Sequence, residues 1–88
     1  MAQKMTIGEV GLAVHNIIAK ELCLESIPRR ENRLVEDLEA DSLDLLGISV
    51  KLEERFGREI PPRNFEMLRT VEDVVNYIFT HQESESAV

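Results

Sequence analysis

The sequence predicts an all-α fold: a small four-helix bundle of three main helices and one short helix, with a long loop between the first and second helices. Apolar residues recur at helical spacing in three separate segments, and no segment alternates apolar and polar residues for long enough to form a strand. A chain of 88 residues has room for one hydrophobic core, so residues 1–88 are predicted to be a single domain. We expect order over residues 5–80 and a flexible tail over residues 81–88.

The first helix is predicted from Thr6 to Leu22. Its apolar residues are spaced by three or four positions and line one face; they are Val10, Val14, Ile17, Ile18 and Leu22. Thr6 and Glu9 are a capping-box pair, in which each side chain can accept a hydrogen bond from the other residue's backbone amide. This pair predicts where the helix begins.

A long connection follows from Cys23 to Asp41 and is interrupted by Pro28. A stretch of this length without a helical period is unusual as a bare loop. We therefore expect it to pack back on the core through four apolar side chains, which are Leu24, Ile27, Leu34 and Leu38.

The second helix is predicted from Ser42 to Phe56, with Asp41 and Ser42 both suited to capping its start and Gly57 ending it. Its apolar residues fall into two stripes. One stripe has core spacing and consists of Leu45, Ile48, Leu52 and Phe56. The other is rotated around the helix axis and consists of Leu43, Leu46 and Val50. Because a helix in so small a protein buries one broad face, we expect the second stripe to be partly exposed or to lie against something else.

The last part of the chain is predicted to hold the short helix and the third main helix. The short helix spans Asn64 to Leu68. The main helix begins at Thr70, with Asp73 as the acid three residues on, and continues to Phe79. Its apolar residues are Val71, Val74, Val75, Ile78 and Phe79.

Composition and charge limit the function classes. The chain has 10 Lys and Arg against 17 Asp and Glu, a formal charge of −7. Binding to nucleic acid or to an anionic membrane needs clustered basic residues, so we expect neither, and we expect charged partners to be basic. The single cysteine, Cys23, allows no internal disulfide and indicates a reducing, cytoplasmic location. We expect a monomer that does not insert into membranes.

The densest acidic stretch, residues 36–44, holds five acids and no base around one hydroxyl, that of Ser42. The stretch does not match the calcium loop of an EF-hand. Such a loop needs Gly at its sixth position and Glu at its twelfth, where this chain has Ser42 and Ile48. No metal site is therefore predicted. A catalytic serine needs a nearby base, but His15 lies in the first helix and His81 at the tail. From the residues alone, Ser42 is by default a helix cap.

Three blocks in order resemble the acyl carrier protein family. Residues 37–44 follow the family pattern D-L-G-x-D-S-L-D, with Glu39 in place of Gly. Residues 52–60 follow L-E-x-x-F-x-x-x-I, and residues 70–78 follow T-V-x-D-V-x-x-Y-I. The resemblance covers residues 6–79 and implies a four-helix carrier domain.

The resemblance implies that Ser42 is the attachment point of a covalent 4′-phosphopantetheine arm, whose thiol holds an acyl group as a thioester. The chain would be a non-catalytic carrier for fatty-acid or specialised acyl or polyketide biosynthesis. Its implied partners are a phosphopantetheinyl transferase (a holo-acyl-carrier-protein synthase) and acyl-transferring and synthase enzymes with basic docking patches. Two alternatives remain: an unmodified carrier-like protein–protein interaction module, and a carrier of an amino acid or other small cargo.

The resemblance also implies a docking surface and an acyl pocket. The predicted docking residues are Asp41, Leu43, Asp44, Leu46, Val50, Glu53, Glu54 and Glu66. The predicted pocket residues are Ile48, Leu52, Phe56, Leu68, Val71 and Val75. Taken one at a time, the acids also suit a solvated helix face, and the apolar residues also suit an ordinary core.

Several positions depart from the family pattern. Glu39 stands where Gly is usual, and Gly47 stands where an acid is usual on the docking helix. Lys51 and Arg58 add positive charge nearby, and residues 62–64 replace an acidic run. The docking face is thus less negative, which favours specialised partners over the general fatty-acid cycle.

Overall fold

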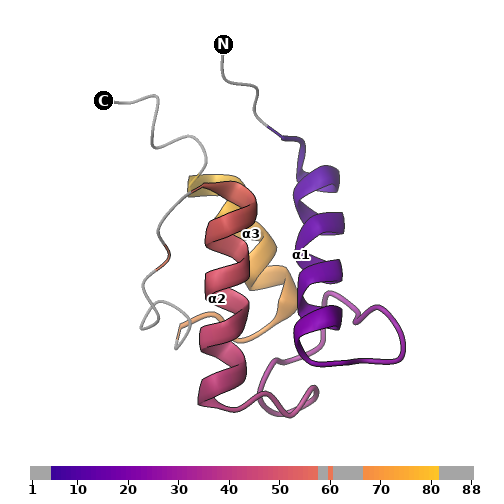
Figure 1. Cartoon of the computed structure of the whole chain (residues 1–88). Coiled ribbons are helices and arrows are strands. Elements are labelled where there is room, and N and C mark those ends of the chain that lie inside the picture. Colours follow the sequence, from indigo (N-terminus) through magenta and orange to yellow (C-terminus); the bar gives the residue numbers. More distant parts are fainter. Residues whose placement is uncertain (1–4, 58–59, 61–66, 82–88) are drawn as a thin grey trace.

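A computed structural model describes residues 5–57, 60 and 67–81 (Figure 1). These residues form the helices α1 (Ile7–Glu21), α2 (Ser42–Phe56) and α3 (Val71–His81). Among them there is no strand, and the one β-type pairing is an isolated bridge between Arg33 and Thr70. The all-α prediction is confirmed.

Each helix begins within one residue of its predicted start, because a reciprocal cap closes each start. In each pair the side chain of the first residue accepts from the backbone amide of the second, and the side chain of the second accepts from the amide of the first. The pairs are Thr6 and Glu9, Asp41 and Asp44, and Thr70 and Asp73. At the far end of α2, Gly57 has a φ of 70°, a left-handed conformation that a residue without Cβ adopts easily.

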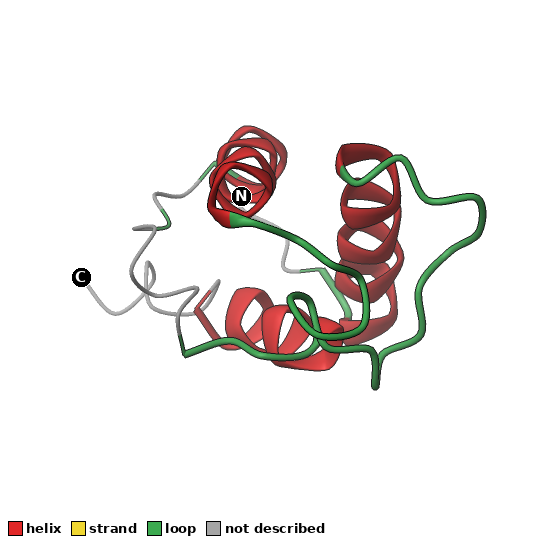
Figure 2. Ribbon diagram, turned by 90° about the horizontal axis from the view of Figure 1, so that it is seen from below, coloured by secondary structure: helices red, strands yellow, loops and turns green. Residues whose placement is uncertain are grey.

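The helix α1 supports the other two. It packs against both α3 and α2, whereas the backbones of α2 and α3 approach each other only marginally. In Figures 1 and 2, α1 and α2 lie side by side and α3 crosses behind them. The core draws on all three helices and on the connection; it consists of Val10, Val14, Ile18, Leu34, Ala40, Ile48, Leu52, Ile60, Val71, Val74, Val75 and Ile78.

The connection between α1 and α2 is fastened to the start of α3. The buried Leu34 donates its amide to the Arg69 carbonyl at 2.8 Å, and the Val71 amide donates to the Asn32 carbonyl at 3.0 Å. These bonds satisfy backbone groups of a long irregular segment. The expected packing of the connection on the core is therefore confirmed at Leu34.

One expected anchor of the connection is wrong. Ile27 is 52% exposed, while the neighbouring Pro28 is buried. The Pro28 carbonyl accepts a hydrogen bond from Nδ1 of His15 on α1 at 2.8 Å. This bond fixes the connection to α1 through the proline, so Ile27 faces solvent. Leu24 and Leu38 are half-buried.

Some predictions fall outside the described residues. Most of the short helix over Asn64–Leu68 lies there, and its two described residues, Met67 and Leu68, are not helical. Glu66 and residues 82–88 of the predicted tail also lie there, while α3 reaches His81. None of the helices in residues 5–57 and 67–81 has the length and apolar character that crossing a membrane requires.

Candidate functional site at the start of α2

The side chain of Ser42 is exposed at the first residue of α2. Asp41 before it has an extended backbone, with φ −103° and ψ −174°, so the chain enters the helix directly at the serine. The capping role belongs to Asp41 and not to Ser42. Among the described residues no group bonds to the serine hydroxyl, which is therefore presented to solvent.

The first turn of α2 has room for an anion. Oδ1 of Asp41 accepts from the Asp44 amide at 2.9 Å, and Oδ2 of Asp44 accepts from the Asp41 amide at 3.1 Å. The amides of Ser42 and Leu43 have no acceptor in the described part of the chain. Free amides and the positive end of the helix dipole favour a phosphate at such a place. The residues present thus fit a phosphate-linked group on the Ser42 oxygen.

Asp37, another acid of residues 36–44, makes local bonds. Asp37 accepts from the Arg33 backbone amide at 2.8 Å and from Arg33 Nε at 3.4 Å. These bonds, the backbone one foremost, hold the pKa of the Asp37 carboxyl below its ordinary value. Across residues 5–57, 60 and 67–81, no group of three or more His, Cys, Asp or Glu side chains could hold a metal ion.

Glu39 adopts a left-handed backbone conformation, with φ 60°. A residue with a Cβ is strained there, and glycine is not. The family pattern has Gly at this position, so the strain explains that preference in physical terms. Sequence reasoning noted the substitution but missed its backbone consequence, although the Gly in the pattern was the signal that could have revealed it.

The second apolar stripe of α2 is exposed, as expected. The exposed fractions are 76% for Leu43, 45% for Leu46 and 41% for Val50. Leu43 directly follows Ser42, so the stripe leads from the serine along the outer face of the helix. Three exposed apolar side chains on one face are typical of a surface that meets a partner.

The predicted docking acids differ in their surroundings. Asp41 and Glu54 are exposed, and Asp44 is half-buried. Oε2 of Glu53 accepts from the Ile60 amide at 2.8 Å, so this carboxylate fastens the chain that follows α2. Glu53 therefore has a structural task in addition to any role in docking.

The predicted pocket residues lie in or beside the core. Ile48, Leu52 and Val71 are fully buried, Val75 is 7% exposed, and Phe56 and Leu68 are half-buried. They come from α2, from α3 and from the residues just before α3. The backbones of α2 and α3, which carry five of these six residues, approach each other only marginally.

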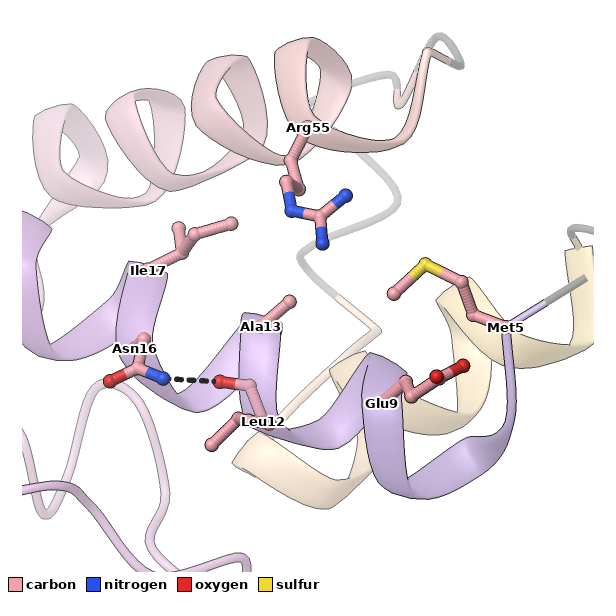
Figure 3. A pocket seen from close by; sticks show the side chains of 7 residues that line it. All are labelled: Met5, Glu9, Leu12, Ala13, Asn16, Ile17 and Arg55. Atoms are coloured by element: carbon pink, nitrogen blue, oxygen red, sulfur yellow. Dashed lines mark hydrogen bonds between the residues drawn. The ribbon is translucent and has the colours of Figure 1, made fainter.

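A hollow of about 650 Å³ lies elsewhere, between α1 and the end of α2 (Figure 3). In Figure 3 the Arg55 side chain points from α2 toward α1. A second hollow of about 490 Å³ shares Ile17 and Arg55 with the first and continues along the two helices. Neither hollow is lined by a predicted pocket residue.

Comparisons with known proteins agree with this geometry. A family model described as "Phosphopantetheine attachment site" matches residues 13–78. The chain is 42% identical to an acyl carrier protein of Campylobacter lari over 66 residues, covering 74% of this chain and 86% of the relative. It is 46% identical to an acyl carrier protein of Chlamydia caviae over 70 residues, covering 78% and 91%. The chain therefore belongs to the acyl carrier protein family, with its covalent 4′-phosphopantetheine.

Proposed function

We propose that this protein carries acyl groups as thioesters on a 4′-phosphopantetheine arm attached to Ser42, and that it does not itself catalyse a reaction. The observation that carries the proposal is the exposed Ser42 hydroxyl at the start of α2, beside two free amides. When attached, the group supplies a terminal thiol for the acyl chain. Ser42 needs only to be accessible, because a phosphopantetheinyl transferase supplies the chemistry of attachment.

The test is modification of the purified protein. Incubation with coenzyme A and a broad-specificity phosphopantetheinyl transferase should add one arm, measured as a single increase in intact mass. Ser42→Ala should remain unmodified. Ser26→Ala, which removes an exposed hydroxyl from the connection, should be modified like the wild type. An arm on Ser42→Ala would refute the assignment, and an unmodified wild type would favour an interaction module that only docks.

The exposed stripe Leu43, Leu46 and Val50 would form the apolar centre of the docking surface. Acidic side chains around it would meet Lys and Arg on the partner enzymes. Such charge pairing mainly raises the association rate and specificity and weakens in salt. Partners are therefore proposed to be the transferase and the acyl-transferring and synthase enzymes, each with a basic patch.

The seam between α2 and α3 is proposed to hold the acyl chain. The side chains on both sides of it are apolar, and each methylene transferred from water into such surroundings contributes roughly 0.8 kcal/mol before the cost of opening the bundle. Ile48 and Leu52 would contact the chain from α2, and Val71 and Val75 from α3. Support comes from the marginal approach of these two helices, because the seam can widen without separating either helix from α1.

The pathway is proposed to be fatty-acid biosynthesis or a specialised acyl pathway. The replacement of an acid by Gly47 on the docking helix favours the specialised alternative. The discriminating experiment is recovery of the native thioester, followed by mass analysis of the group released from it. A fatty acyl group of ordinary length would support fatty-acid biosynthesis, and an amino-acyl group would refute both acyl pathways.

A further inference from the structure

A carboxylate from α1 lies on the outer surface of α2 at Gly47. A Cβ built on Gly47 would collide with Oε2 of Glu21, with Cδ of Glu21 at 3.0 Å and its Cγ at 3.4 Å. The Glu21 side chain thus occupies the space that a side chain at position 47 would need. Glu21 is the last residue of α1, and in Figure 1 this end of α1 lies beside the first half of α2.

The position of Gly47 on α2 places this carboxylate beside the exposed stripe. Gly47 lies four residues after Leu43 and three before Val50, so the three residues share one helix face. Glu54 lies on the same face about one turn after Val50 and is exposed. The Glu21 carboxylate therefore borders the stripe on the side of α1, in line with Glu54.

Helix stability does not account for Glu21. A negative charge at the C-terminal end of a helix opposes the helix dipole. Lys20 and Lys51 line the hollow of about 490 Å³ together with Glu21. Within the described residues, however, Glu21 forms no ion pair. Glu21 is half-buried, and its carboxylate lies against α2 at Gly47 without a cation partner in the part of the chain that the structure describes.

At the level of Gly47, α2 presents no acid of its own beside the exposed stripe. Gly47 contributes no side chain, and Glu53 is bonded to the Ile60 amide. A basic partner approaching Leu43 and Val50 would therefore meet the carboxylate of Glu21 where α2 itself offers none.

We propose that Glu21 of α1 is a docking residue for the enzymes that act at Ser42, and that Gly47 is the residue that admits it to the surface of α2. The occupant is a protein surface with apolar side chains facing Leu43 and Val50 and a Lys or Arg facing Glu21. Charge complementarity and continuity with Ser42 identify this occupant, so the inference rests on the proposed function. The interface spans two helices rather than α2 alone.

The test measures kcat/KM for arm transfer from coenzyme A by a phosphopantetheinyl transferase at low ionic strength. Glu21→Gln should lower kcat/KM by about two- to fivefold, the range of one exposed charge pair, through a higher KM and an unchanged kcat. High salt should remove the difference. The matched control is Glu25→Gln, which removes an exposed acid from the first part of the connection. This control should match the wild type.

A second pair of variants separates position from net charge. The double variant Glu21→Ala with Gly47→Glu keeps the wild-type charge, clears the space beside position 47 and moves the acid onto α2, so kcat/KM should return toward the wild-type value. Gly47→Ala should raise the melting temperature by replacing a helical glycine, and should lower kcat/KM by displacing Glu21. Opposite changes in stability and docking are not expected from a residue with a merely structural role.

Two results would overturn the inference while leaving the proposed function intact. One is equal kcat/KM for Glu21→Gln and Glu25→Gln with normal modification of Ser42. The other is failure of the charge-conserving double variant to recover. Absence of any modification of the wild type would instead refute the proposed function and the inference together.

Discussion

The starts of α2 and α3 have the same local structure but serve different purposes. Each is closed by a reciprocal pair of side chain and amide, Asp41 with Asp44 and Thr70 with Asp73. The first helical residue of α3, Val71, is completely buried, whereas the first residue of α2, Ser42, is exposed. The local sequence closes each helix start, but the packing of the helix decides whether the next side chain serves the core or a partner.

The largest expected effect is on the free energy of unfolding, when the first helical residue of α3 is replaced and compared with that of α2. Val71→Ala should lower the free energy of unfolding by about 2 kcal/mol, because two buried methyl groups are lost and a cavity remains. Ser42→Ala should change it by less than about 0.5 kcal/mol, as is usual for an exposed site. Urea denaturation of both variants measures the difference. A comparable loss at both positions would contradict the assignment of opposite roles.

The next effect tests whether the two caps are equivalent. Asp41→Ala and Thr70→Ala should each lower the free energy of unfolding by about 1 kcal/mol, because each leaves an amide of the first turn without its acceptor. The two losses should be alike, although one cap lies beside the exposed serine and the other beside the core. Denaturant unfolding of the single variants measures them, and a negligible loss at Asp41 would show that the α2 cap is not stabilising.

A smaller effect on the free energy of unfolding, of opposite sign, is expected at Glu39 in the segment that leads to α2. Glu39→Gly should raise the free energy of unfolding by about 0.5–1 kcal/mol, because glycine adopts the left-handed backbone without strain but loses more chain entropy on folding. Glu39→Ala is the control and should give little gain, since alanine keeps the Cβ. Thermal unfolding distinguishes them; a gain with alanine as large as that with glycine would point to charge rather than backbone strain.

The smallest effect concerns the carboxylate of Asp37, in the connection that leads to α2. Asp37 bonds Arg33, which in turn bridges to Thr70. Because the pKa of Asp37 is lowered in the folded state, its contribution is present above the ordinary carboxyl pKa and is lost as the pH falls through the lowered one. Asp37→Asn should therefore be slightly less stable than the wild type at pH 7.

The difference between wild type and Asp37→Asn should shrink as the pH falls below about 4, where the wild-type carboxyl gains a proton. Urea denaturation at a series of pH values from 7 downward measures it. Glu36→Gln, which changes an exposed neighbouring acid, should show no such convergence. A difference independent of pH would contradict the role assigned to the carboxylate.

Local signals in the sequence were sufficient to predict the helix starts and the exposed stripe of α2. A side-chain acceptor three residues before an acid identifies a cap without tertiary information, as at Thr6 and Thr70; at α2 the sequence left Asp41 and Ser42 both suited to the role. The stripe could be predicted because helical periodicity separates Leu43 from the core face. Both features depend on residues within a few positions of one another.

The features that escaped sequence reasoning depend on contacts between distant segments. Whether Ile27 or Pro28 is buried is decided by the bond to His15 on α1. The proximity of Glu21 to Gly47 depends on where α1 ends relative to α2. No periodicity within one helix reports on either arrangement.

The marginal approach of α2 to α3 has a consequence for how the domain communicates with its surroundings. Under the proposed function, an acyl chain that enlarges the space between them would change the orientation of α2 relative to α3 while both helices stay packed on α1. The exposed Leu43 and Val50 and the buried Ile48 all belong to α2, so they move together with this helix. An enzyme bound to the outer face of α2 would therefore meet a differently oriented helix when an acyl chain is bound, without contacting the acyl chain itself.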